Sequence, residues 1–437
     1  MLGVMFALIP LALKSGFVAF LLWVYTTVLS PHLYLYGFMQ GFRYTFVFAG
    51  IALMLLWLRK VENRGRFHYD ATSILMILFV LHAILSATFS LQPNLLVWFR
   101  LEFFLKGMVL AFVVPFYLTS RWRIHMMLLV LVAGLGFHAM LDGLKMITSA
   151  GAHNIYGIPR STLSDNNLYA LGMVMLLPLF LYFARYSAHQ IAKWVALIAF
   201  ALCVMTVLGS NSRGGFLALA ILGFWYWVTS SRKFVSTIFV VIVSLGVIQF
   251  APDRWFERVE TLKTATEDGS FLGRVAAWKV SLNIANSNPI FGGGFHAVEN
   301  QWIWETYKNT PNLIPIDIVE MKSKAAHSNY FQVLGDLGYV GLFIFLGLLA
   351  SAFVTRWQIK HIAAKNKGDF DWAADLATAI NLSLVAFMAG GAGVSLAYFE
   401  LVYVFIMTQC AIHRLLINEV AQSRALSLSQ AKAFSHV

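Results

Sequence analysis

Arg213 is the first side chain whose surroundings suggest chemistry. It follows Ser210-Asn211-Ser212 in a polar turn between two apolar stretches, and two glycines come directly after it. An arginine at the edge of hydrocarbon is costly and usually faces a wet cavity or an anion. Its guanidinium group suits a phosphate, and the glycines would let a substrate approach the backbone closely. The alternative is an interfacial arginine that snorkels to lipid headgroups.

Two more candidates lie in the polar segment 251–329. Arg274 falls within 273–282, where apolar residues at helical spacing predict an amphipathic helix that ends at Asn288-Pro289. Taken alone, it would be a solvated charge on that helix. His327 stands where the segment meets the next apolar stretch. A histidine titrates near neutral pH and can accept a proton from an attacking hydroxyl, although a lone histidine is by default structural.

Nearby carboxylates could support this chemistry. Asp336 and Glu299 are candidates for orienting His327, although spacing alone does not pair them with it. A local ion pair is expected among three polar residues near the outer end of one apolar stretch: His138, Asp142 and Lys145.

The polar loop 158–167 adds a further basic candidate, Arg160, which could join an anion site. Ser164 or Asp165 in the same loop is expected to cap the helix that follows. The glycine-rich stretch 291–295 is expected to form a flexible loop. No P-loop, paired-histidine metal motif or Asp-x-Asp motif is found, so we expect neither a metal nor a cofactor. The expected substrate-binding residues are Arg160, Asn211, Ser212, Gly293 and Asn329.

The composition places the chain among integral membrane proteins. Of its 437 residues, 59% are hydrophobic and 12% are charged, so a soluble fold would leave large apolar areas in water. A span needs about 20 mostly apolar residues, and by this measure the sequence predicts an all-α bundle of about twelve spans. The first is counted as one broken span over 1–30. The others are 41–58, 71–89, 100–118, 124–143, 166–184, 191–208, 214–230, 234–250, 330–355, 374–391 and 396–415.

The basic residues set the expected orientation of these spans. They gather in loops that fall on one side when the spans alternate, so that side is expected to be the cytoplasm, in a bacterial inner membrane. The net charge of +12 is thereby explained without nucleic-acid binding. The outer side then carries the Gly390-Gly391-Ala392-Gly393 turn and the segment 251–329, in which acidic and basic residues nearly balance. The expected divisions are N-terminal transmembrane helices 1–250, a periplasmic loop 251–329, C-terminal transmembrane helices 330–416 and a mobile cytoplasmic tail 417–437.

The order and spacing of several short motifs resemble the O-antigen ligase and polymerase superfamily. The N-terminal half, with Pro31-His32 and Asp165-Asn166-Asn167, resembles the branch of O-glycosylation ligases found near exosortase systems. The motifs that carry the main resemblance are Ser210-Asn211-Ser212-Arg213-Gly214-Gly215, Arg274 with Trp278, Pro289, Gly292-Gly293-Gly294-Phe295, His327-Ser328-Asn329 and Leu334-Gly335-Asp336-Leu337-Gly338.

This resemblance implies a polytopic glycosyltransferase of the GT-C type. Such enzymes transfer a glycan from undecaprenyl pyrophosphate to an acceptor on the periplasmic face without a metal ion. For a ligase, the acceptor is a sugar hydroxyl of the lipid A core. The essential arginines of the superfamily correspond to Arg213 and Arg274, which would stabilise the pyrophosphate, and its essential histidine corresponds to His327, which would act as the base. Arg160 has no counterpart that can be aligned.

Three alternatives remain open. A polymerase would use another lipid-linked repeat as the acceptor, and a protein O-oligosaccharyltransferase would use serine or threonine. A flippase or transporter would also have many spans and a cavity arginine. The sequence shows no inverted repeat, and its unusual polar clusters fall on one side of the expected membrane rather than at its midplane.

Overall fold

Helices make up all the regular structure that the computed structural model describes, which covers residues 2–34, 37–229, 269–318, 321–366 and 368–434, with the single residues Lys233 and Thr237. The expected span 234–250 and the start of the long polar segment lie outside these residues. The elements, in chain order, are α1 (Leu2–Lys14), α2 (Gly16–Leu29), η1 (Pro31–Tyr34), η2 (Gly37–Gly41), α3 (Tyr44–Trp57), α4 (Ala71–Thr88), α5 (Leu95–Tyr117), α6 (Arg121–Thr148), α7 (Asn166–Tyr186), α8 (Gln190–Gly209), α9 (Arg213–Thr229), α12 (Gly269–Ser287), α13 (Gln301–Tyr307), α14 (Asn329–Lys365), α15 (Asp371–Gly390) and α16 (Glu400–Phe434).

Within these residues, seven helices are long and apolar enough to cross a membrane: α4, α6, α7, α8, α14, α15 and α16. Three shorter apolar helices, α2, α3 and α9, add to them. The expected span 100–118 corresponds to α5, which is long but carries Arg100, Glu102 and Lys106. The structure thus supports a multi-pass helical membrane protein, with fewer spans meeting the length and composition criteria than the twelve expected.

The two ends of the chain differ from the expectations. The N-terminal stretch, counted as one broken span, forms two helices because the Ser15 hydroxyl accepts a hydrogen bond from the Val18 amide (3.5 Å) and caps α2. The C-terminal tail, expected to be mobile after Asn418, continues α16 as far as Phe434. Its sequence contains four alanines, two leucines and two glutamines, which favour helix even where no core covers them.

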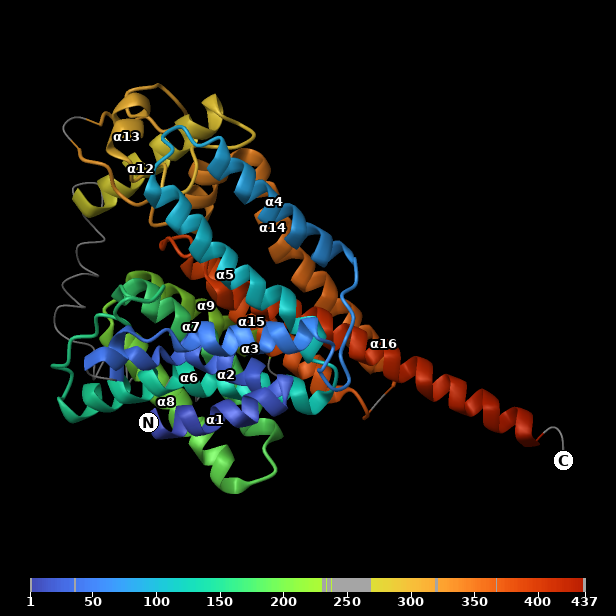
Figure 1. Cartoon of the computed structure of the whole chain (residues 1–437). Helices are drawn as coiled ribbons and strands as arrows, with labels where there is room; N and C mark the ends of the chain where they lie inside the picture. Colours follow the sequence, from blue (N-terminus) through green and yellow to red (C-terminus); the bar gives the residue numbers. More distant parts are fainter. Residues whose placement is uncertain are drawn as a thin grey trace.

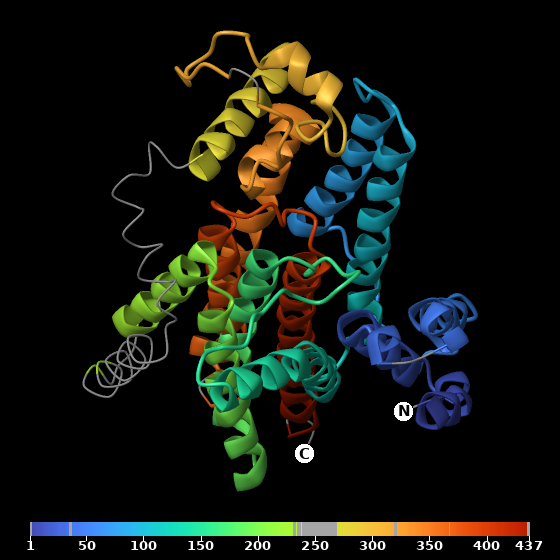
Figure 2. The same cartoon turned by 90° about the vertical axis from the view of Figure 1, so that its left-hand side faces the viewer.

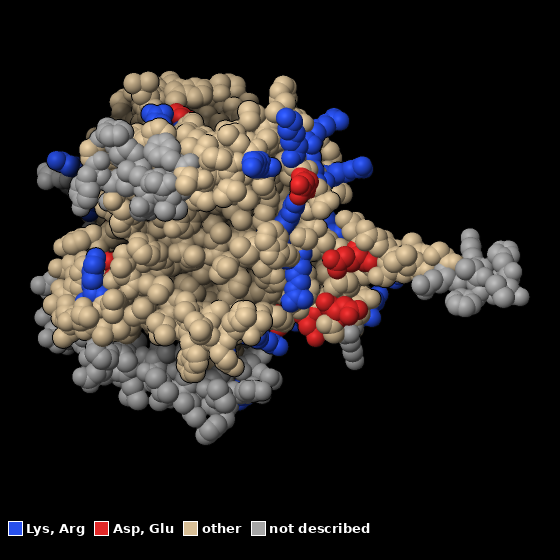
Figure 3. All heavy atoms as spheres, turned by 60° about the horizontal axis from the view of Figure 1, so that its bottom comes forward, with Lys and Arg blue, Asp and Glu red and all other residues tan. Residues whose placement is uncertain are grey.

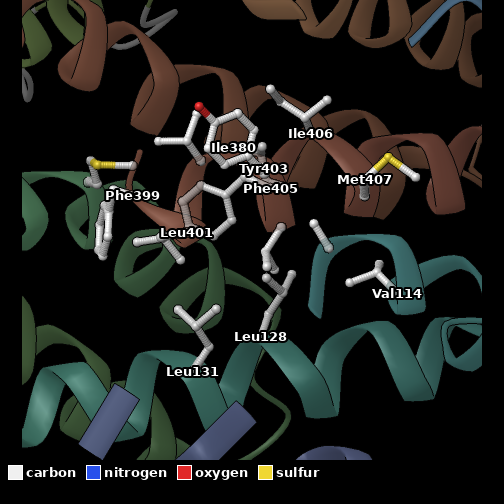
Figure 4. Close-up of a cluster of buried hydrophobic side chains, with 14 of the residues drawn as sticks. Val114, Leu128, Leu131, Ile380, Phe399, Leu401, Tyr403, Phe405, Ile406 and Met407 are labelled. Carbon is white, nitrogen blue, oxygen red and sulfur yellow. The ribbon is translucent and has the colours of Figure 1, made fainter. Parts of the chain in front are cut away.

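The spanning helices pack around one apolar core. Figure 4 shows part of it, where side chains of α5, α6, α15 and α16 point toward one another, among them Leu128, Ile380 and Phe405. Elsewhere large apolar side chains face outward, and Trp57 is 81% exposed. A broad surface in Figure 3 carries no charge, and charged side chains gather at the end from which α16 projects. This distribution suits a surface that is covered by lipid.

α12 and α13 form a separate lobe with a small core of its own, which includes Ala277, Val280 and Trp304. Figures 1 and 2 show this lobe over the adjacent ends of α4, α5 and α14. α12 confirms the expected helix, begins four residues earlier and ends just before Asn288-Pro289, but it is buried on most of its sides rather than amphipathic.

The glycine-rich stretch 291–295 is hydrogen-bonded to α14, contrary to the flexible loop expected there. The amides of Gly293 and Gly294 donate to the carbonyls of Gly335 and Asp336, each at 2.9 Å. α14 is broken nearby at Gly338, whose φ of 70° favours glycine and whose position faces the Pro289 carbonyl. This packing joins the lobe to the spanning helices.

Candidate functional site

Three segments that carry candidate residues approach the turn between α15 and α16, residues 390–396. The Asn329 amide donates to the Gly391 carbonyl (2.7 Å), and the Asn329 Oδ1 accepts from the Leu396 amide (2.6 Å). A Cβ on Gly391 would overlap the side-chain amide of Asn329, so this close approach requires glycine. Asn329 Nδ2 and Ser395 Oγ are buried without a hydrogen-bond partner among the described residues. Buried polar groups without a partner are uncommon in folded proteins and are consistent with a ligand group close to the turn.

Arg274 reaches the same turn from the lobe. It lies in the second turn of α12 and is half-buried, and its Nη1 donates to the Gly393 carbonyl at 3.5 Å. Lys324 brings a second cation close, because its Nζ would lie 2.7 Å from a Cβ on the neighbouring Gly273. The Arg274 guanidinium is thus directed at the spanning helices rather than being a solvated surface charge. Together with Lys324 it forms a cationic region that suits an anion.

Arg213 belongs to a second segment beside the turn. Ser212 caps α9 by accepting a hydrogen bond from the Gly215 amide at 3.1 Å, which makes Arg213 the first residue of the helix. A Cβ on Gly214 would lie 3.1 Å from Val394 and 3.5 Å from the Gly390 carbonyl, so the start of α9 lies against residues 390–394. The Arg213 side chain is exposed. A helix N-terminus and an exposed arginine together favour an anion.

His327 lies two residues before the start of α14 and is half-buried, with a left-handed φ of 44°. Burial lowers the pKa of His327 below its usual value, and the charges of Arg274 and Lys324 lower it further, against Asp165 and Glu299, which raise it. Its ring is therefore neutral at pH 7 and able to accept a proton.

The two carboxylates expected to orient His327 have other partners, so that expectation is wrong. Glu299 pairs with His296, with 2.9 Å between Oε2 and Nδ1. Asp336 accepts from the Ala297 amide (3.2 Å) and from the Tyr398 hydroxyl (3.0 Å). Glu299 acts on His327 only through its charge.

The remaining candidates are spread around the site. Arg160 is exposed in a turn with φ of 56°, and the structure gives it no contact with the other candidates. Asn211, with φ of 53°, donates to the Gly209 carbonyl at 3.4 Å. Asp165 caps α7 as expected, accepting from the Asn167 amide at 2.8 Å.

The polar group toward the C-terminal end of α6 is only partly the expected ion pair. Asp142 pairs with Lys145 at 3.7 Å, as expected, and also accepts from the Tyr169 hydroxyl at 3.0 Å. His138 instead bonds the Tyr34 hydroxyl at 2.8 Å. In the described part of the chain, no three His, Cys, Asp or Glu side chains group as metal ligands.

Two family models match parts of this sequence. Residues 198–346 match the family model described as O-antigen ligase. This match places residues 198–346 in the O-antigen ligase and polymerase superfamily. Residues 1–188 match a family of unknown function (DUF5935). Among curated proteins, none matches this sequence. The region of this O-antigen ligase domain contains Arg213, Arg274, His327 and Asn329, whereas the turn 390–396 that they approach lies beyond it.

Two parts of the site were missed by sequence reasoning. The turn 390–396 was noted only for its glycines, and their density was the available signal of a close backbone approach. His296 gave no signal beyond its place after a glycine-rich stretch, because its pairing with Glu299 depends on the local fold.

Proposed function

We propose that this protein is an O-antigen ligase, a membrane glycosyltransferase of the GT-C type. It would transfer a glycan from undecaprenyl pyrophosphate to a sugar hydroxyl of the lipid A core, on the periplasmic face of a bacterial inner membrane. The observation that carries this proposal is the approach of three segments, those of Arg213, Arg274 and His327-Ser328-Asn329, to the turn 390–396. All three segments lie within the part of the chain that matches the O-antigen ligase family.

The arginines would bind the pyrophosphate of the donor. Negative charge grows on this group as the bond between the anomeric carbon and the phosphate oxygen breaks, and preorganised cations stabilise it most at that moment. Arg274 is held by the Gly393 carbonyl, and Arg213 stands at the start of α9 beside the same turn. Asn329 Nδ2, buried and unpartnered, supplies a further donor. In this proposal the arginines provide the charge that a divalent metal provides in other transferases.

His327 would be the general base. Its lowered pKa keeps the ring neutral, so it can take the proton of the acceptor hydroxyl as that oxygen attacks the anomeric carbon. One bond forms between the acceptor oxygen and the anomeric carbon, and the bond to phosphate breaks. Undecaprenyl pyrophosphate leaves, and the anomeric configuration inverts.

The test is transfer by the purified protein. We expect a ladder of high-mass lipopolysaccharide when the full chain is mixed with lipid-linked glycan and rough lipopolysaccharide, and we expect it to survive EDTA. A longer lipid-linked glycan without any lipopolysaccharide acceptor would identify a polymerase, and glycan on serine or threonine would identify a protein transferase. Movement of lipid-linked glycan across vesicles without a new covalent product would identify a transporter.

Variants separate the proposed roles. His327→Ala should abolish transfer and keep donor binding, whereas Arg213→Ala and Arg274→Ala should weaken donor retention about tenfold or more, the scale of one charged hydrogen bond. Arg66→Ala is a matched control, because Arg66 is exposed in the loop before α4, at the opposite end of that helix from the lobe. Unchanged turnover in His327→Ala, or equal donor affinity in the arginine variants and the control, would contradict these roles.

A further inference from the structure

A second polar cavity lies beside the proposed site, between the α4–α5 connection and the lobe. It measures about 300 Å³ including its open mouth. Its floor is apolar and includes Val97, Phe295 and Ile303. Four polar, uncharged residues also line it: Ser90, Gln92, Asn94 and Asn300.

The charged wall of the cavity is the His296–Glu299 pair. The two side chains are 2.9 Å apart, and His296 is 16% exposed while Glu299 is 39% exposed. Burial alone would raise the pKa of Glu299, but the hydrogen bond and charge of His296, with the charge of Arg100, lower it below its usual value. Glu299 is therefore a carboxylate acceptor at neutral pH, and His296 retains Nε2 for a ligand because Nδ1 bonds Glu299.

One segment of the chain, residues 323–327, connects the surroundings of the cavity with those of the proposed pyrophosphate site. The Ser323 hydroxyl donates to the Glu299 carbonyl (2.9 Å), and the Ala326 carbonyl accepts from the Trp278 indole of α12 (2.8 Å). Residues 323–326 therefore run between the wall of the cavity and the helix that carries Arg274. His327 is the last residue of this segment, and the charges of Arg274 and Glu299 both affect its pKa.

We propose that this cavity binds the sugar whose hydroxyl is to be glycosylated, with Glu299, His296 and Gln92 as ligands of its neighbouring hydroxyl groups. The carboxylate accepts hydrogen bonds, whereas the imidazole and the side-chain amide offer donors and acceptors, and a polyhydroxylated ring requires both kinds. The charges of Glu299 and Arg100 oppose each other, which disfavours a strongly ionic ligand. The acceptor must present a hydroxyl to His327, and the charge of Glu299, a residue of the cavity lining, acts on His327. The inference that the bound sugar is the acceptor rests on the proposed function, but sugar binding itself can be measured separately.

The binding test uses saturation-transfer NMR on the detergent-solubilised full chain, with the methyl α-glycosides of glucose, galactose and mannose as probes. We expect a saturation-transfer signal from at least one glycoside, and we expect this signal to be lost in Glu299→Gln and in Gln92→Ala. It should persist in Glu305→Gln, a matched control on α13 whose carboxylate pairs with Lys308 and does not line the cavity. Absence of transfer to all three probes, or equal signals in the cavity variants and the control, would overturn the proposal.

The kinetic test separates this inference from the proposed function. At pH 8, where His327 is neutral, Glu299→Gln should raise the KM for rough lipopolysaccharide about tenfold, the scale of one charged hydrogen bond, and leave the KM for the lipid-linked donor unchanged. If transfer occurs and the acceptor KM does not change, the cavity inference fails while the function stands. If sugar binding follows the cavity variants but no glycan is transferred, the function fails while the cavity remains a sugar site.

Discussion

Gly391→Ala tests the contact on which the site depends. The added carbon would overlap the Asn329 side-chain amide and lie 2.5 Å from the Phe387 carbonyl. Gly391 has an ordinary φ of −65°, so the effect is steric rather than conformational. Overpacking of this kind costs about 1–3 kcal/mol of the free energy of unfolding. It should also displace Asn329 from the Gly391 carbonyl and the Leu396 amide, and therefore slow transfer.

A double-mutant cycle with Asn329→Ala isolates this contact. Asn329→Ala alone leaves the buried Leu396 amide without its acceptor, at about 1–3 kcal/mol. In that background the Gly391→Ala clash is relieved in part, since the Phe387 carbonyl remains close. We expect a coupling of about 1 kcal/mol or more between the two changes.

The assay is unfolding of the purified protein in detergent by SDS or heat, followed by helicity and tryptophan fluorescence. Gly223→Ala is the matched control, because it lies in α9 and an added carbon there meets nothing within 4 Å. It should be neutral or stabilise the protein by up to about 1 kcal/mol. Additive effects in the cycle, or a Gly391→Ala variant as stable as the control, would show that Asn329 does not pack on Gly391 as described.

Three further outcomes are expected. Lys324→Gln removes a cation that lowers the pKa of His327, so that pKa should rise and the acid limb of a kcat/KM–pH profile should move to higher pH; an unmoved limb would argue against His327 as the base. Ser212→Ala should lower the free energy of unfolding by about 1 kcal/mol through loss of the α9 cap, whereas Ser212→Thr should retain most of it. Gly338→Ala should cost at least about 1–2 kcal/mol, because its φ of 70° is left-handed and the Pro289 carbonyl would lie 2.7 Å from the new carbon; a wild-type unfolding midpoint would contradict this.

Helices were largely predictable from the sequence because apolar runs and capping residues act locally. Asp70, Asn94 and Ser120 each accept a hydrogen bond from the amide three residues later, at the starts of α4, α5 and α6. Predictions failed where apolar length competed with a local signal. Ser15 divides the N-terminal stretch, and the polar end of α16 remains helical through propensity alone.

The candidate site could be predicted only as separate pieces. Arg274 and His327 stand out by type and position, but their neighbours come from distant parts of the chain. Asn329 and Gly391 lie 62 residues apart, and their hydrogen bond follows from the packing of α14 on α15 rather than from any local pattern. The same applies to Glu299, whose partner could not be chosen among nearby histidines without the fold.

Three features that reduce stability occur in and beside the proposed site. His296 and His327 have left-handed φ angles of 63° and 44°, and Asn329 buries an unpartnered amide nitrogen. Each arrangement costs free energy of order 1–3 kcal/mol unless a ligand or neighbouring structure compensates for it. A core selected for stability alone would place glycine at the first two positions and an apolar or fully bonded side chain at the third. His296 lines the proposed sugar cavity, and His327 ends the segment 323–327 beside it. The side-chain amide of Asn329 lies at the turn 390–396. Left-handed residues other than glycine also occur away from the site, at Ser30, Arg59, Asn63 and Ala150, so these features support the proposed substrate positions only in combination with the contacts described above.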